Sequence, residues 1–322
     1  MNITILGAGA FACALATIFN RKTLNVTIWS KLENEINYIK DNHHCMNEKS
    51  IIVDENIALT SDLKFAVANC QVIIIAIPAP FCKEVFQELK SYYNNQYIII
   101  ATKGIDTKSC MFVSEILTKT IKSKRVSVIS GPSFAVDIAN KVPTGLSLAS
   151  KNKKNTDVIK SIIDNEHITV YPTTDVIGTE ICGAIKNVIA IASGIIKGLN
   201  LPETTQAMFI TDSLHDIKEL INKLGGKRDT ILSYAGFGDL LLTCTSPKSR
   251  NFSFGMVVAT SDKNTIDKYL QNHTVEGVNT LATIYKLIKR KKIKIPIIDC
   301  IYKIVIEGKA PQSIIDVINN RK

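Results

Sequence analysis

The chain has 322 residues, of which 46% are hydrophobic and 21% charged, and its formal net charge is +10 at pH 7. This length allows two domains and a substantial core, and this composition is typical of a soluble globular protein. The stretch MNITILGAGA lacks the basic residues of a signal peptide, and no uninterrupted apolar run reaches the ~18 residues of a membrane span. We therefore expect a cytoplasmic protein without an integral membrane segment.

The first half of the chain alternates between apolar runs and helical patterns. Strands are predicted at 2–6, 25–29, 72–80, 97–104 and 125–133, with weaker candidates at 144–150 and 167–173. Helical stretches such as 10–20 and 82–93 lie between them. Continuous Ile and Val runs are typical of strands that are buried on both faces, as in parallel sheets. The pattern therefore predicts a doubly wound, mostly parallel α/β sheet.

After about residue 175 the pattern becomes entirely helical. Helices are predicted at 180–198, 202–224, 228–234, 264–271, 277–291, 297–307 and 312–320, with Gly and Pro between them. We expect a dinucleotide-binding domain at 1–176 and a helical domain for substrate binding and catalysis at 177–322.

A glycine-rich turn follows the first strand. Gly7, Gly9 and Ala12 form a G-x-G-x-x-A pattern that opens a helix. Such a turn lets the backbone approach a pyrophosphate at the helix N-terminus, so it indicates a Rossmann-type domain; packing alone is the other interpretation. Ser30 and Lys31 stand where an NAD site usually has an acidic residue. We therefore expect NADPH to be preferred and NADH to be the alternative, unless Lys31 is only a surface lysine.

Several polar residues interrupt apolar surroundings. Lys103 follows the buried strand that ends in IIIA, and Lys186 stands in the almost wholly apolar run GAIKNVIAIASG. Lys186 would act as general acid and base in carbonyl reduction, with Asp239 as its charge partner. Arg250 would hold a substrate phosphate, and Asn251 would add hydrogen-bond donors. Each residue also has a structural interpretation: a snorkelling lysine, a helix cap or a surface arginine.

Metal and nucleic-acid sites are not expected. The eight cysteines and five histidines show no metal-ligand spacing, so reduced core thiols are the simplest interpretation. The basic run KLIKRKKIKI at 286–295 contains no aromatic residue for base stacking. We expect a solvated helix end there rather than a nucleic-acid surface, and an overall charge that suits anionic small molecules.

The chain resembles the bacterial NAD(P)-dependent glycerol-3-phosphate dehydrogenase family. The resemblance rests on GAGAFACALA, ATKG, SGPSFA, GAIKNVIAIASG, AGFGDLLLTCT, SRNFSFG and TVEG, which occur in the order and at the spacings of that family. It extends to about residue 310. It implies reversible reduction of dihydroxyacetone phosphate to sn-glycerol 3-phosphate, which supplies glycerophospholipid synthesis, and it is compatible with a homodimer.

The resemblance also implies a set of site residues, with Lys186 as proton donor and acceptor. The residues implied at the substrate are Lys103, Gly131, Ser133, Asp239, Ser249, Arg250 and Asn251, and, from more distant relatives, Asn187 and Thr243. The residues implied at the cofactor are Ala10, Phe11, Lys31, Lys103, Ala135, Arg250, Thr274 and Glu276.

The chain departs from the family pattern at the glycine turn. Ala12 replaces a Gly, Ala10-Phe11 replace a hydroxyl residue and an aromatic, and another basic residue often stands in place of Lys31. Two alternatives stay open: a related β-hydroxyacid or phosphogluconate-type dehydrogenase, and a non-catalytic NADPH-binding sensor.

Overall fold

The computed structural model describes residues 1–21 and 23–320. The chain forms two compact units, one made of Met1–Lys103 and Val113–Val176 and the other of Gly104–Phe112 and Ile177–Lys322. A single boundary between residues 176 and 177 does not describe this division fully. The short segment Gly104–Phe112 groups with the second unit, whose apolar core includes Ile105 and Phe112.

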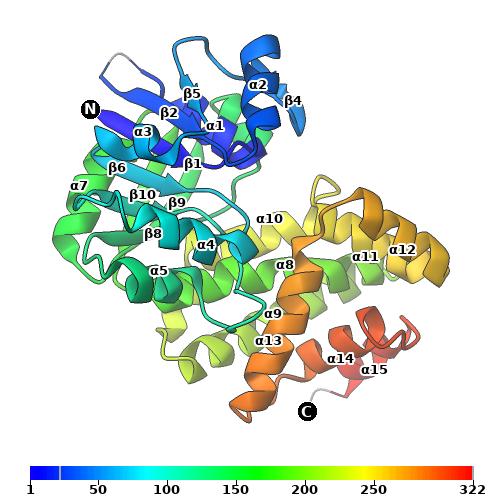
Figure 1. Ribbon diagram of the computed structural model, residues 1–322. Coiled ribbons are helices and arrows are strands. Elements are labelled where there is room, and N and C mark those ends of the chain that lie inside the picture. The colour runs from blue at the N-terminus through cyan, green and yellow to red at the C-terminus, as the bar shows by residue number, and fades with distance from the viewer. Residues whose placement is uncertain (22, 321–322) are drawn as a thin grey trace. The chain divides into compact units, whose positions relative to one another are not determined.

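An eight-stranded sheet with flanking helices forms the first unit (Figure 1). Its order is β10-β9-β8-β7-β6-β1-β2-β5, and every neighbouring pair is parallel except β8 with β9. The strands are β1 (Asn2–Leu6), β2 (Asn25–Trp29), β5 (Ala58–Thr60), β6 (Val72–Ile75), β7 (Tyr97–Ile100), β8 (Val126–Ser130), β9 (Thr144–Ala149) and β10 (Ile168–Thr173). The predicted parallel sheet is therefore confirmed, while β5 was not predicted.

Helices pack against both faces of this sheet because successive strand residues point to opposite sides. Ile3 and Ile5 belong to an apolar cluster with residues of α1, α2, α6 and α7. Thr4, between them, donates its hydroxyl hydrogen to the backbone oxygen of Ala66 in α3. The helices are α1 (Ala10–Phe19), α2 (Glu33–Asn42), α3 (Leu63–Ala68), α4 (Ala79–Leu89), α5 (Val113–Ile121), α6 (Ala135–Ala139) and α7 (Lys153–Ile163).

A small antiparallel hairpin accompanies the sheet and has no predicted counterpart. It consists of β3 (His44–Cys45) and β4 (Glu48–Ile52). Its strands are too short and too polar to give a periodic signal in the sequence.

The regular elements described in the second unit are helices, and its separate segment Gly104–Phe112 forms only a bridge between Ile105 and Phe112. Its helices are α8 (Val176–Gly198), α9 (Glu203–Lys223), the 3-10 helix η1 (Arg228–Leu232), the π-helix η2 (Tyr234–Gly238), α10 (Asp239–Thr245), α11 (Arg250–Thr260), α12 (Lys263–Asn272), α13 (Glu276–Arg290), α14 (Pro296–Val305) and α15 (Ser313–Asn319). The Rossmann-type fold followed by an all-helical domain is thus confirmed. The helices α10 and α11 were not predicted, because Gly236, Gly238 and Pro247 break the periodicity of that stretch.

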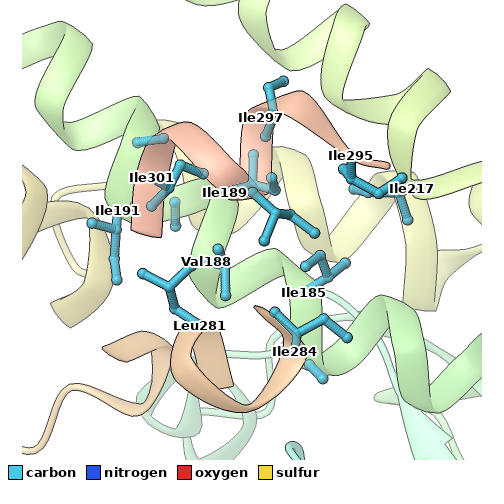
Figure 2. Close-up of a cluster of buried hydrophobic side chains, with 14 of the residues drawn as sticks. Ile185, Val188, Ile189, Ile191, Ile217, Leu281, Ile284, Ile295, Ile297 and Ile301 are labelled. Atoms are coloured by element: carbon cyan, nitrogen blue, oxygen red, sulfur yellow. The ribbon is translucent and has the colours of Figure 1, made fainter. Parts of the chain in front are cut away.

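The helix α8 runs through the core of the second unit. Figure 2 shows Ile185, Val188 and Ile189 of α8 gathered with Leu281 and Ile284 of α13 and with Ile297 and Ile301 of α14. By length and composition α8 could cross a membrane, but 94% of its most apolar 18-residue window is buried inside the folded chain. Burial of that kind is ordinary for a core helix, so the apolar character of α8 is explained by packing.

Candidate active site

The glycine turn of the first unit has the geometry that a phosphate group requires. Gly7 has a φ of +129°, and a Cβ on it would lie 2.5 Å from the backbone oxygen of Ala76, so only glycine fits there. A Cβ on Gly9 would meet nothing within 4 Å, which leaves open space beside the backbone. Gly9 is also the N-cap of α1, and no side chain caps that helix or places an acid in its first turn.

These features fit the pyrophosphate of a dinucleotide. The first amides of α1 keep their donors available, and the N-terminal end of the helix dipole favours negative charge. Ala12 is fully buried, so the alanine that replaces the usual third glycine packs without leaving a gap. The sequence departure at Ala12 is therefore compatible with the turn.

Lys103, Gly131 and Ser133 come together in the first unit. Lys103 Nζ lies 3.4 Å from the backbone oxygen of Gly131 and 6.0 Å from the centre of the Phe11 ring. Ser133 Oγ donates to the same oxygen of Gly131 at 2.9 Å. The adjacent Ala135 is the first residue of α6. Two separate segments thus place an ammonium group and a hydroxyl around one carbonyl.

Lys31 carries its charge at the surface, close to the end of β2. It forms an ion pair with Glu84 of α4, and the side chains are 56% and 64% exposed. The hydrogen bond to the Glu84 carboxylate raises the pKa of Lys31. The neighbouring Ser30 is buried and donates to Glu35 Oε2 at 2.6 Å. Because an exposed ion pair contributes little to stability, Lys31 can exchange Glu84 for another anion at small cost.

The second unit buries a lysine–aspartate pair. Lys186 Nζ of α8 lies 2.5 Å from Asp239 Oδ1, and the two side chains are only 11% and 1% exposed. Asp239 begins α10, and Thr243, one turn later, donates from Oγ1 to the Asp239 backbone oxygen at 2.6 Å. Lys186 therefore does not snorkel into solvent, and the charge partner expected from the sequence is present. The carboxylate compensates the desolvation of the ammonium.

The helix α10 is fixed in place from both ends. Before it, the π-helix η2 leads directly into Asp239, and the Ser233 hydroxyl accepts from the amide of Gly236. Near its end, the backbone oxygen of Cys244 accepts hydrogen bonds from Ser193 Oγ at 2.8 Å and Gln206 Nε2 at 3.1 Å. These contacts hold the Asp239 carboxylate against α8.

A second polar network begins at Asn187, which follows Lys186 in the sequence. Asn251 Nδ2 donates to Asn187 Oδ1 at 3.0 Å, while Asn251 Oδ1 accepts from the amide of Gly277 at 2.9 Å. Asn187 Nδ2 in turn donates to Glu276 Oε2 at 3.3 Å. Asn187 and Asn251 are both buried, so three of the residues predicted from separate motifs meet in one chain of hydrogen bonds.

The helices that carry these two asparagines cross closely. A Cβ on Gly194 of α8 would lie 2.0 Å from the backbone oxygen of Phe252, and one on Gly255 of α11 would lie 2.0 Å from that of Ile191. Larger residues at this crossing would push α11 away. The glycine pair thus brings Asn251 within reach of Asn187.

The remaining predicted residues of the second unit lie at helix starts. Ser249 is buried and caps α11, since its Oγ accepts from the Phe252 amide at 3.3 Å. Arg250 and Thr274 are exposed, and neither joins the hydrogen bonds of the two buried networks. Arg250 is the first residue of α11, so its guanidinium stands at a helix N-terminus.

Sequence reasoning missed the partners that position the predicted residues. These are Glu84 at Lys31, Ser193 and Gln206 behind α10, and the amide of Gly277 at Asn251. Gly277 and Ser193 carried a signal, because they belong to the TVEG and GAIKNVIAIASG motifs. Within residues 1–21 and 23–320, no group of three or more His, Cys, Asp or Glu residues could hold a metal ion.

Comparison with known proteins shows similarity along the whole chain. Two profiles, the N-terminus and the C-terminus of NAD-dependent glycerol-3-phosphate dehydrogenase, match residues 2–156 and 175–316. A glycerol-3-phosphate dehydrogenase (NAD(P)+) of Thermoanaerobacter sp. is 35% identical over 97% of this chain and 94% of its own length. The protein of that name from Staphylococcus haemolyticus is 33% identical over 95% and 94%.

A solved structure agrees with these sequence matches. The crystal structure of glycerol-3-phosphate dehydrogenase from Coxiella burnetii is 30% identical, covers 99% of both chains and superimposes with a TM-score of 0.93. Both the sequence and the fold therefore favour the family resemblance over the two alternatives, a β-hydroxyacid or phosphogluconate-type dehydrogenase and a non-catalytic NADPH-binding sensor.

Proposed function

Because this chain belongs to the NAD-dependent glycerol-3-phosphate dehydrogenase family, we propose that Lys186 is the general acid and base of its reaction. The chain is an oxidoreductase that uses a nicotinamide dinucleotide. Its reaction is the reversible reduction of dihydroxyacetone phosphate to sn-glycerol 3-phosphate. The buried pair of Lys186 with Asp239 is the observation that carries the assigned role of the lysine.

Reduction of a ketone requires a hydride at carbon and a proton at oxygen. The nicotinamide, when bound, supplies the hydride. Lys186 Nζ donates the proton to the carbonyl oxygen as negative charge develops on it, and it takes the proton back in the reverse reaction. Asp239 and Thr243 are positioning residues: the carboxylate orients the ammonium, and the threonine hydroxyl fixes the backbone that carries the carboxylate.

The substrate phosphate calls for cations and hydrogen-bond donors. Arg250, with five N–H donors at the start of α11, is the residue best suited to it. Asn251 and Asn187 hold the amide network beside Lys186. The remaining proposed substrate residues are Lys103, Gly131, Ser133 and Ser249.

We assign the cofactor to the glycine turn of residues 1–176 and the chemistry to residues 177–322. Lys31, an exposed cation after β2 that pairs with Glu84, would favour NADPH over NADH. The cofactor residues would be Gly7, Gly9, Ala10, Phe11, Ala12, Lys31, Lys103, Ala135, Arg250, Thr274 and Glu276. We further propose a cytoplasmic protein that supplies glycerophospholipid synthesis and forms a homodimer without a nucleic-acid partner.

One assay tests the central assignment. Oxidation of NADPH is followed with dihydroxyacetone phosphate for the wild type, Lys186→Ala and the matched control Lys197→Ala, which lies on the exposed end of the same helix. General acid–base catalysis predicts that kcat of Lys186→Ala falls by roughly 100- to 10,000-fold, while NADPH binding is retained. Lys197→Ala should match the wild type. Unchanged turnover in Lys186→Ala would remove the lysine from the mechanism, and an inactive wild type would remove the function.

A further inference from the structure

Two buried thiols lie beneath the glycine turn. Cys13 Sγ of α1 lies 3.4 Å from the backbone oxygen of Ala8, and Cys45 Sγ of β3 lies 3.7 Å from the same oxygen. All three residues are at most 2% exposed. The described residues offer the Ala8 oxygen no other hydrogen-bond donor. The carbonyl between Gly7 and Gly9 is therefore satisfied by cysteine alone.

These thiols also fix the direction of an amide in the turn. The C=O of Ala8 and the N–H of Gly9 belong to one planar peptide group and point in opposite directions. Holding the oxygen inward against the thiols therefore holds the Gly9 N–H outward. A buried carbonyl that loses its donors tends to rotate toward a new partner, because an unsatisfied buried acceptor is unfavourable.

The Cys13 and Cys45 side chains approach the same carbonyl oxygen, and the hydrogen bond between them gives the two thiols different pKa values. A hydrogen bond from the Cys13 thiol lowers the pKa of Cys45, with help from the amides of Asn47 and Glu48 and against the effect of burial. The same contact, with burial, raises the pKa of Cys13. When Cys45 ionises, the single Cys13 hydrogen bonds to its thiolate, and a thiolate next to a protonated thiol is the arrangement from which disulfides form.

The geometry points to a modification site: peroxide oxidises Cys13 and Cys45 to a disulfide, and this cross-link weakens dinucleotide binding at the glycine turn. The Cys45 thiolate attacks one oxygen of hydrogen peroxide, and the O–O bond breaks. Cys45 becomes a sulfenic acid, and a hydroxide ion leaves and takes up a proton. The Cys13 sulfur then attacks the Cys45 sulfur, the S–O bond breaks, and the disulfide forms. Two thiols and one peroxide yield one disulfide and two waters.

The local structure explains how peroxide reaches Cys45 and how the disulfide affects the glycine turn. Cys45 belongs to a two-residue strand that pairs with β4 at two positions with an irregularity between them, so this hairpin opens more readily than the central sheet. Disulfide sulfurs carry no hydrogen. Oxidation therefore removes every thiol hydrogen that can reach the Ala8 oxygen, and it releases the peptide group that orients the Gly9 amide.

The experiment measures the cross-link and the affinity separately. Reduced wild-type protein is treated with hydrogen peroxide, digested without reduction and mapped by mass spectrometry, with the half-buried Cys110 as a reporter that the oxidant acted. The expected product is a Cys13–Cys45 linked peptide. In parallel, NADPH binding by fluorescence should weaken at least about tenfold and recover with dithiothreitol.

Matched variants complete the test. Cys13→Ser and Cys45→Ser keep a hydroxyl donor for Ala8 but cannot cross-link, so their affinity should not respond to peroxide. Cys70→Ser, which alters a buried thiol elsewhere, should respond as the wild type does. Oxidised Cys110 without the linked peptide, or the linked peptide without a reversible loss of affinity, would overturn the inference.

The inference rests on the proposed cofactor turn, and the two fail differently. Failure of reduced protein to bind NADPH would refute the cofactor assignment together with the effect on affinity. The mapped peptide would still report whether the disulfide forms. Binding in the reduced protein with no linked peptide would refute the modification site alone.

Discussion

Asp239 Oδ1 accepts a hydrogen bond from Lys186 Nζ at 2.5 Å, in a place where neither side chain has appreciable contact with water. The two residues are separated by 53 positions and belong to different helices. A charge pair at this depth is unfavourable to split, since the remaining ion stays buried without compensation. The pair is therefore a structural as well as a chemical unit.

The first prediction concerns the stability of that pair. Lys186→Met and Asp239→Leu should each lower the free energy of unfolding by about 3–5 kcal/mol, because each leaves one buried charge without its oppositely charged partner. The double variant should recover most of the loss. Urea unfolding of the four proteins measures the coupling, and additive losses in the double variant would show that the pair is not coupled.

The second prediction separates the two glycines of the turn. Gly7→Ala should destabilise the fold by more than about 2 kcal/mol, because it combines strain at positive φ with a clash against Ala76. Gly9→Ala should leave stability within about 0.5 kcal/mol, since its Cβ enters open space. It should nevertheless weaken NADPH binding by at least about tenfold. Thermal unfolding and fluorescence titration check both halves, and tight binding by Gly9→Ala would contradict the pyrophosphate assignment.

The third prediction concerns the amide network. Asn251→Ala removes the oxygen that accepts from the Gly277 amide and the amide group that donates to Asn187 Oδ1. The free energy of unfolding should therefore fall by about 1–3 kcal/mol. The exposed Asn272→Ala, whose amide reaches only a backbone oxygen within its own helix, is the control and should change little. Guanidinium unfolding measures both variants. Equal small losses would mean that the network contributes nothing beyond an ordinary surface contact.

The fourth prediction concerns the choice of dinucleotide. Lys31→Ala should lower kcat/KM with NADPH by about tenfold and leave kcat/KM with NADH unchanged, because a single charge-assisted contact is lost. Glu84→Gln releases Lys31 from its ion pair and should preserve or improve the use of NADPH. Steady-state kinetics with both nucleotides decide the matter. A parallel fall with NADH would assign Lys31 a role unrelated to the 2′-phosphate.

The fifth prediction concerns pH. Asp262 caps α12 by accepting from the Thr265 amide at 2.9 Å, and hydrogen bonds from the Thr265 side chain and amide hold the pKa of Asp262 below its ordinary value. A lowered folded pKa gives a contribution to stability that is present above the unfolded pKa and lost as pH falls through the folded one. Asp262→Asn should lose this part of the acid sensitivity, whereas Asp267→Asn on the same helix should keep it. Thermal melts between neutral pH and the acid limit provide the measurement.

Much of the fold could be predicted from local patterns in the sequence. The runs that became β1, β6, β7 and β8 are apolar because both faces of the sheet are covered, and the glycine turn is readable because φ and close approach require Gly7. The helix α8 was predicted for similar reasons. Lys186 stood out within it because a cation in such an apolar run needs an explanation.

The parts that escaped prediction depend on distant segments. Arg250 and Asn251 begin a helix whose position is set by Gly194 and Gly255 across a crossing, which no local periodicity reveals. Glu84 reaches Lys31 from 53 positions away, and Cys45 reaches Ala8 from 37 positions away. Such partners are set by tertiary packing, so their spacing carries no regular signal.

The π-helix at Tyr234–Gly238 has a consequence for how this segment tolerates change. A π-turn holds one residue more than an α-turn, and each residue of an α-helix advances the side chain direction by about 100°. Deleting a single residue here would therefore rotate α10 and swing the Asp239 carboxylate away from α8, even though every functional residue would still be encoded. Length in this short stretch is thus constrained as strictly as chemistry, and engineered variants of this protein should substitute within it but never shorten or extend it.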